Sequence, residues 1–212
     1  MDNKNEFKPY IPADKIVPEF TVTSVLIGII LAVVFGAANA YIGLLVGMTI
    51  SASIPAAVIS MGIIRVILRR DSILENNLVQ TIGSAGESLA AGAIFTLPAL
   101  FLWAEEGKID YPSVITIFFI ALFGGLLGVC FMVPLRQALN VEEHGTLPFP
   151  EGTACAEVLL AGEEGGSKAG SVFTGLGVAA VYKFIADGLK LFPSEIGYAF
   201  KSYAGSQIGI QV

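Results

Sequence analysis

Long uncharged stretches dominate the chain, and the charged residues gather in short segments between them. The longest such stretch runs from Thr21 to Ile64 and comprises 44 residues. At about 1.5 Å per helical residue, this run is roughly twice as long as the hydrocarbon core of a bilayer is deep. The pattern therefore predicts two membrane-spanning helices joined by a tight turn, which we place at Asn39 to Gly43.

The alternation of apolar runs and charged segments continues along most of the chain. The runs that predict membrane spans cover residues 21–41, 44–66, 77–103, 111–135 and 169–192. We therefore expect an all-α integral membrane protein, a polytopic bundle of about five transmembrane helices plus a short re-entrant or interfacial helix. Residues 1–20 would form a cytoplasmic segment, residues 21–193 one transmembrane domain, and residues 194–212 a truncated extracytoplasmic loop.

The basic residues predict the orientation of these spans, because cytoplasmic loops favour Lys and Arg. Lysines precede the first span, and three arginines, Arg65, Arg69 and Arg70, follow the second. The loop from Glu105 to Asp110 is acidic on balance and is expected on the outer side. We therefore predict a multi-pass protein of a bacterial or archaeal cytoplasmic membrane, with its N-terminus in the cytoplasm.

Composition agrees with a membrane protein and excludes several other classes. The chain is 54% hydrophobic and 14% charged, its mean hydropathy is +0.75, and its 24 glycines suit closely packed membrane helices. The two cysteines, Cys130 and Cys155, form no CxxC pair, and His144 is the single histidine and is expected in a loop. HExxH and GxSxG motifs are missing from the sequence. We therefore predict no enzyme, no catalytic residue, no metal, no cofactor and no nucleic-acid partner.

Glu87 is the most costly residue in this pattern, because it is the single charge between Asn76 and Ala104. A carboxyl group at membrane depth usually faces a bundle interior or a water-filled path. Gln80 and Ser84 precede it at helical spacing and extend a polar stripe along the same face. These residues predict either a proton or substrate pathway, or a structural glutamate satisfied by hydroxyl groups of a neighbouring helix.

A second polar group lies in the first uncharged run. Asn39 and Tyr41 stand among glycines, and Gly43 and Gly47 form a GxxxG pattern that lets another helix approach closely. Helix packing alone explains this pattern, and the alternative is that Asn39 and Tyr41 line a substrate path. Pro55 further predicts a kink in the helix that contains it.

The segment from His144 to Gly166 is less apolar than the predicted spans, yet it contains the pattern of a short helix beginning near Pro150. Glu151 would lie at the positive end of that helix, shielded from solvent and on the substrate pathway. Short helices that enter from one side build substrate sites in transporters. The alternative is an amphipathic connector on the membrane surface.

Lys183 and Asp187 stand four residues apart in the last apolar run. A helix places residues at this spacing on one face, where the two charges can pair. We interpret them as a structural ion pair, with a transport role as the alternative.

Four segments together resemble the oligopeptide transporter (OPT) family, in its prokaryotic branch. They are Gly36–Gly43 with Met48–Met61, Asn77–Ala99, Leu147–Glu157 and Tyr182–Phe192. The resemblance implies a secondary transporter that moves peptides, or metal chelates in a related branch, and that is coupled to protons. It also implies that this chain is the N-terminal part of a longer protein.

Three functions of different kinds are therefore compared. A proton-coupled oligopeptide transporter explains Glu87, the kinked helix and the short helix together, and a transporter of siderophore-like metal chelates needs a similar polar cavity. A non-transporting scaffold subunit explains the apolar spans and the glycines but not the cost of Glu87. The expected partners are the lipid bilayer, protons, and a peptide or a metal chelate.

Overall fold

The computed structural model describes residues 9–12, 14–70, 72–143, 145–164, 166–189, 197–201 and 207–211. His144 lies outside the described residues, and so do the side chains of the last predicted segment, 194–212. The chain divides into two compact units, residues 1–164 and residues 165–212.

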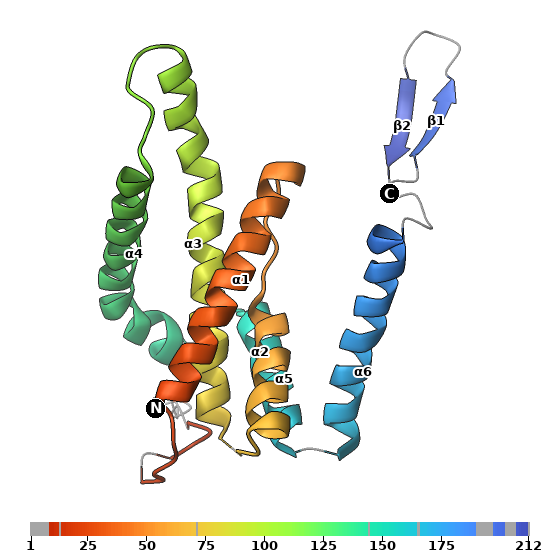
Figure 1. The fold of residues 1–212 in the computed structure, drawn as a ribbon. Helices are drawn as coiled ribbons and strands as arrows, with labels where there is room; N and C mark the ends of the chain where they lie inside the picture. The colour runs from red at the N-terminus through yellow and green to blue at the C-terminus, as the bar shows by residue number, and fades with distance from the viewer. Residues whose placement is uncertain are drawn as a thin grey trace. The chain divides into compact units, whose positions relative to one another are not determined.

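Five α-helices make up the first unit (Figure 1). They are α1 (Val22–Val46), α2 (Ser53–Met61), α3 (Ile73–Glu105), α4 (Val114–Arg136) and α5 (Pro150–Glu164). Two of them continue as π-helical turns, α2 through Gly62–Ile67 and α4 through Gln137–Glu142. The second unit contains α6 (Gly166–Lys183), a π-helical turn at Phe184–Gly188, and two antiparallel strands, β1 (Gly197–Lys201) and β2 (Gln207–Gln211).

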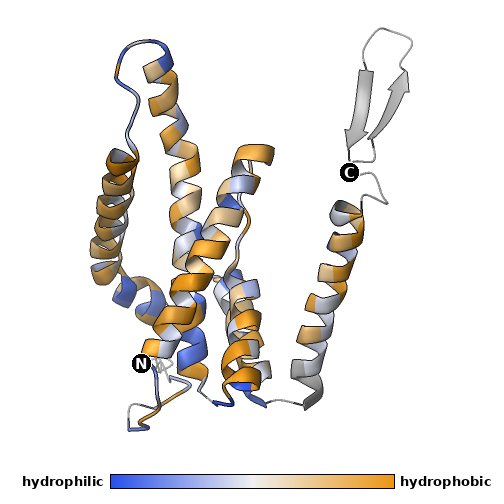
Figure 2. Ribbon diagram, viewed as in Figure 1, coloured by the Kyte–Doolittle hydropathy of each residue, from blue (hydrophilic) through white to orange (hydrophobic). Residues whose placement is uncertain are grey.

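The predicted class is confirmed, but the number of full-length spans is smaller. Among the described residues, three helices are long and apolar enough to cross a membrane, at Val22–Val46, Ile73–Glu105 and Val114–Glu142. The two other predicted spans correspond to shorter apolar helices, Ser53–Ile67 and Gly170–Ala186. Figure 2 shows the uniform apolar surface of α4, none of whose residues is buried in this chain. Such a helix suits a lipid or helix environment.

The predicted turn at Asn39 to Gly43 is wrong, because α1 continues to Val46. The helix ends instead at Gly47, whose φ of 77° places it in the left-handed region and whose N–H donates to the Gly43 carbonyl at 2.9 Å. Glycine is the residue that adopts this conformation without a steric penalty, and it commonly terminates helices in this way. The chain then returns in a non-helical segment, residues 48–52, before α2 begins.

The helical part that follows is too short to be the predicted second span. Residues 53–67 rise only about 22 Å at 1.5 Å per residue, less than the roughly 30 Å of a hydrocarbon core. The apolar run from Thr21 to Ile64 therefore forms one full helix, a break and a half-length helix. Pro55, at which the sequence predicts a kink, lies in the first turn of α2, where it does not interrupt a longer helix.

Helices α1 and α3 form the closest pair of the first unit. Gly28 lies against Ile82 and Gly43 against Ile94, so the two helices run in the same direction. Between these contacts, Gly86 approaches the backbone of α1. Small residues permit this approach, as is typical of membrane helix pairs. Gly43 thus has the predicted packing role, whereas Gly47 serves as a helix terminator.

A small apolar core lies where α1, α3 and the end of α2 meet. Its buried members are Leu31 of α1, Ile64 after α2, and Val79 of α3. Since α1 and α3 are parallel, the N-terminal segment and the loop before α3 lie at one end of the first unit, and the α3–α4 loop lies at the other (Figure 1). The candidate functional residues lie between these two ends of the first unit.

Candidate substrate-binding site

Asn39 stabilises the break between α1 and α2. Its side chain is 1% exposed, and its Nδ2 donates to the carbonyl oxygen of Glu87 on α3 at 3.3 Å. Its Oδ1 accepts a hydrogen bond from the N–H of Ile50 at 3.0 Å. Non-helical backbone at membrane depth needs such partners, because lipid offers none. Asn39 therefore ties the returning segment to both helices.

The carboxylate of Glu87 lies at the beginning of α2. Its Oε2 accepts a hydrogen bond from the N–H of Ala52 at 3.1 Å, and Ala52 is the residue that caps α2. The positive end of a helix stabilises a negative charge in this position. Glu87 is 8% exposed, so the group that the sequence singles out is buried, as predicted.

Helix α5 begins beside the beginning of α2. Ser51, in the break, donates a hydrogen bond from its Oγ to Oε1 of Glu151 in the first turn of α5. Ser53 Oγ and Ser84 Oγ lie 2.8 Å apart and link α2 to α3. At the far ends of the two short helices, Gly162 packs against Met61, so α2 and α5 run side by side in the same direction. Two half-length helices thus begin together inside the bundle.

A cavity of about 660 Å³ lies between α2, α3 and α5. Polar lining comes from Ser53, Asn77, Gln80 and Glu151, and the rest is mostly apolar. A second cavity of about 920 Å³ is lined by the segment before α5 and by the start of that helix, including Glu151. Glu151 therefore borders both cavities.

The N-terminal segment lines the end of the first cavity away from Glu151. Pro9, Tyr10 and Ile11 contribute to its wall, and the Tyr10 hydroxyl donates to Oε2 of Glu163 at 3.3 Å. The negative charge of Glu163 raises the pKa of the Tyr10 phenol above its ordinary value, because ionisation would place two negative charges side by side.

Some of the site residues predicted from the sequence lie together in the structure, and others do not. Asn39, Ser84 and Glu87 meet at the break, and Gln80 lines the cavity next to them. Tyr41 does not join them: it is 69% exposed on α1. The helix of Glu151 begins at Pro150 as predicted, and it packs inside the first unit. Glu151 itself is exposed in this chain, so the expectation that it is shielded is wrong.

The predicted ion pair remains a prediction. Lys183 ends α6, and Asp187 lies in the π-helical turn that follows, so the two remain on continuous helical backbone. The side chain of Asp187 lies outside the described residues.

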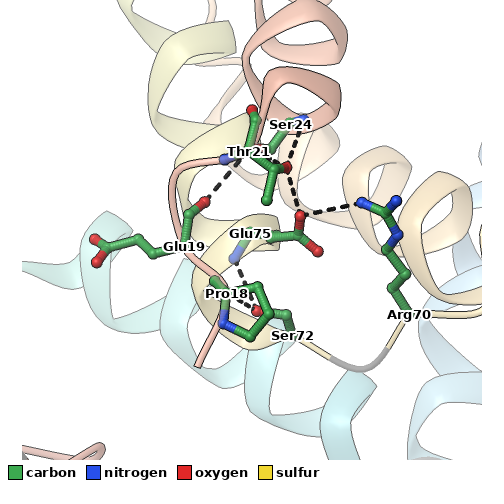
Figure 3. Close-up of polar contacts among 7 residues, drawn as sticks. All are labelled: Pro18, Glu19, Thr21, Ser24, Arg70, Ser72 and Glu75. Atoms are coloured by element: carbon green, nitrogen blue, oxygen red, sulfur yellow. Dashed lines mark hydrogen bonds and ion pairs between the residues drawn. The ribbon is translucent and has the colours of Figure 1, made fainter. Parts of the chain in front are cut away.

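A second buried carboxylate, Glu75, escaped the sequence analysis. It is 2% exposed, and its Oε1 accepts from Thr21 Oγ1 at 2.5 Å and from Arg70 Nη1 at 3.5 Å (Figure 3). Ser72 caps α3 by accepting from the N–H of Glu75, and its Oγ donates to the carbonyl of Pro18. The spacing from Ser72 to Glu75 is that of a capping box, and this signal could have revealed the cluster.

These contacts fasten the beginning of α1 to the beginning of α3. Thr21 caps α1 reciprocally with Ser24, which is fully buried. The cluster lies at the end of the bundle where both helices begin, far along α3 from Glu87. The cluster holds α1 and α3 together where both helices begin, whereas the backbone at the break before Ala52 is less regular.

Apolar helices of spanning length, with two short helices that begin beside a buried carboxylate, define a multi-pass membrane protein. The chain belongs to the OPT oligopeptide transporter protein family, whose model matches residues 19–203. Members of this family are transporters and not enzymes.

The chain is also similar to a curated protein of Haemophilus influenzae named "Putative oligopeptide transporter". The two are 42% identical over 153 residues, which cover 71% of this chain and 23% of the relative. The matched part thus spans about a quarter of the relative's length. No solved structure matches the chain.

Proposed function

We propose that this chain forms the N-terminal part of a proton-driven oligopeptide transporter, in which Glu87 carries the coupling proton. The observation that carries the proposal is the hydrogen bond from the Ala52 N–H to the buried carboxylate of Glu87. This bond joins a full-length helix to the start of a half-length helix, the element that builds substrate sites in transporters.

Protonation of Glu87 would change this junction directly. A charged carboxylate accepts a hydrogen bond roughly twice as strong as a neutral group does. When the carboxyl group takes a proton, its attraction to the beginning of α2 falls, and the start of α2 is held less firmly against α3. Proton binding is thereby linked to the position of the helix that lines the 660 Å³ cavity. That volume lies within the range of about 300–1,000 Å³ typical of small-molecule sites.

The family description favours peptides as the cargo. The orientation proposed for the transporter places the N-terminus and the loop before α3 in the cytoplasm of a bacterial or archaeal cell, since the basic residues concentrate there. The Glu105–Asp110 loop would then face outward.

Uptake into proteoliposomes containing the complete transporter tests this function. A radiolabelled tripeptide should accumulate when the outside is more acidic, and a protonophore should abolish the accumulation. Accumulation of a ferric chelate in place of the peptide would assign the protein to metal-chelate transport. If the protein moved neither solute, with or without a pH gradient, the transporter proposal would fail in favour of a scaffold.

A further inference from the structure

The 660 Å³ cavity has a polar end and an apolar end. Ser53 contacts Ser84, while Ser60 Oγ donates to the carbonyl of Asn76, so α2 runs antiparallel to α3. Because α5 runs parallel to α2, it too is antiparallel to α3. The later residue Gln80 of α3 therefore lies on the side of the early residue Glu151 of α5.

Because α5 is antiparallel to α3, the opposite end of the cavity is lined mostly by apolar residues, together with Tyr10, whose hydroxyl bonds to Glu163. The first residues of α3, Ile73 and Leu74, lie toward the later residues of α5, Leu159 and Leu160. Burial at this end favours an apolar group, whereas the other end offers oxygen atoms of Ser53, Gln80 and Glu151.

The charge in the lining of this cavity is of one sign, negative. Among the described residues that line this cavity, Glu151 is the single charged one. One of its oxygens, Oε1, accepts a hydrogen bond from Ser51, and this bond orients the carboxylate at the N-terminus of α5. Glu151 also interacts with the hydroxyl of Ser53, and the residue as a whole is exposed. An anion placed here would meet a like charge, whereas an ammonium group would find a carboxylate and neutral acceptors.

We propose that this cavity binds the protonated amino end of a short peptide at Glu151, with the first side chain of the peptide among the apolar residues Ile73, Leu74, Leu159 and Leu160. The inference rests on the proposed function and adds to it the part of the peptide that is recognised. The ammonium group would donate to the Glu151 carboxylate, and the oxygens of Ser53 and Gln80, which already bond to Ser84 and Thr81, each keep a lone pair that can accept a further proton. A free amino end and an apolar first residue thus define the preferred class of substrate.

The test compares two peptides and two variants of the complete transporter in proteoliposomes. The peptides are Leu-Ala-Ala and N-acetyl-Leu-Ala-Ala, in which acetylation replaces the ammonium group by a neutral amide. The variants are Glu151→Gln and the matched control Glu157→Gln, since Glu157 is exposed on the same helix and does not line the cavity. Glutamine can still accept the hydrogen bond of Ser51, so Glu151→Gln should fold normally.

In the parent protein, the free peptide should have a KM at least about tenfold lower than the acetylated one, as the loss of one charge-assisted hydrogen bond predicts. Glu151→Gln should raise the KM of the free peptide to that of the acetylated peptide while kcat changes little. The KM of the acetylated peptide should stay the same, which also shows that the variant is folded. Glu157→Gln should behave as the parent.

Two results would overturn the inference while leaving the proposed function intact: equal KM values of the two peptides in the parent, or an unchanged KM of the free peptide in Glu151→Gln. An equal loss of uptake for both peptides in Glu151→Gln would also contradict it, because the residue would then have a structural role. If the parent moved neither peptide, the proposed function would fail first and the inference with it.

Discussion

Gly86 of α3 packs directly on Ala32 of α1: a Cβ atom built at Gly86 would stand 2.4 Å from the Ala32 carbonyl oxygen. That distance is far below any normal contact, and the obstacle is backbone, which cannot rotate away. The pair therefore sets the separation of α1 and α3. Because Glu87 is the next residue, the same contact positions the carboxylate against the break after α1.

The substitution Gly86→Ala should destabilise the protein because α1 must move away. We expect a loss of about 1–3 kcal/mol in the free energy of unfolding, as for other overpacked sites. Gly92→Ala is the matched control on the same helix, since no atom lies within 4 Å of a Cβ built there. It should be neutral or stabilise by about 0.5–1 kcal/mol through helix propensity. Denaturant unfolding in detergent measures both, and equal effects would contradict the close contact.

Thr21→Val tests the anchor between the beginnings of α1 and α3. The change removes the hydroxyl that caps α1 and donates to the buried Glu75 carboxylate. We expect the free energy of unfolding to fall by about 1–3 kcal/mol, because a helix cap is lost and a buried acceptor loses a donor.

Thr96→Val is the control for this anchor. Thr96 is exposed and donates only to a backbone carbonyl of its own helix. Its replacement should change the free energy of unfolding by less than about 0.5 kcal/mol. Should Thr21→Val prove equally harmless, Glu75 would be satisfied without Thr21.

The orientation in the membrane is testable by cysteine labelling. A background without the native thiols, Cys130→Ser with Cys155→Ala, receives either Lys108→Cys or Lys15→Cys. A membrane-impermeant maleimide should label the cysteine at position 108 in intact cells and the cysteine at position 15 only after permeabilisation. The reverse pattern would invert the proposed topology.

The sequence predicts the helices of this chain better than it predicts their breaks. Helix α3 and the start of α5 follow from local signals, namely the apolar run over residues 77–103 and Pro150 ahead of Glu151. Hydropathy, however, measures composition alone. The hydropathy of residues 48–52 is the same whether their backbone is helical or not. Hydropathy therefore could not separate one full span and a half-helix from two spans.

The position of the break depends on contacts that are distant in sequence. Asn39 is a typical turn residue, yet it lies inside α1 because its side chain bonds to Ile50 and to Glu87, 48 residues away. The left-handed Gly47 then ends the helix. The cost of burying Glu87 was visible in the sequence, but its partner, the N–H of Ala52, could be identified only from the fold. Tyr41 is exposed on α1 in this chain, and its role on a substrate path stays a prediction.

The replacement Glu87→Gln separates a coupling role from a structural one. Glutamine keeps the size of the side chain and an oxygen that can accept from the Ala52 N–H, but it cannot take up or release a proton. In the complete transporter, Glu87→Gln should therefore insert and fold as the parent does and should lose peptide accumulation driven by a pH gradient. Exchange of labelled for unlabelled peptide without a gradient should persist, because it requires helix movement but no net proton transfer.

The control for this test is Glu106→Gln, in the loop where Glu106 pairs with Lys108 at 2.6 Å and is more than half exposed. Surface ion pairs of this kind contribute about 0–1 kcal/mol, so this variant should accumulate peptide as the parent does. The measurement is the initial rate of uptake at several imposed pH gradients, with exchange measured in the same vesicles. If Glu87→Gln accumulated peptide against its gradient as well as the control did, Glu87 would serve only to hold the start of α2, and the coupling proton would bind to another group.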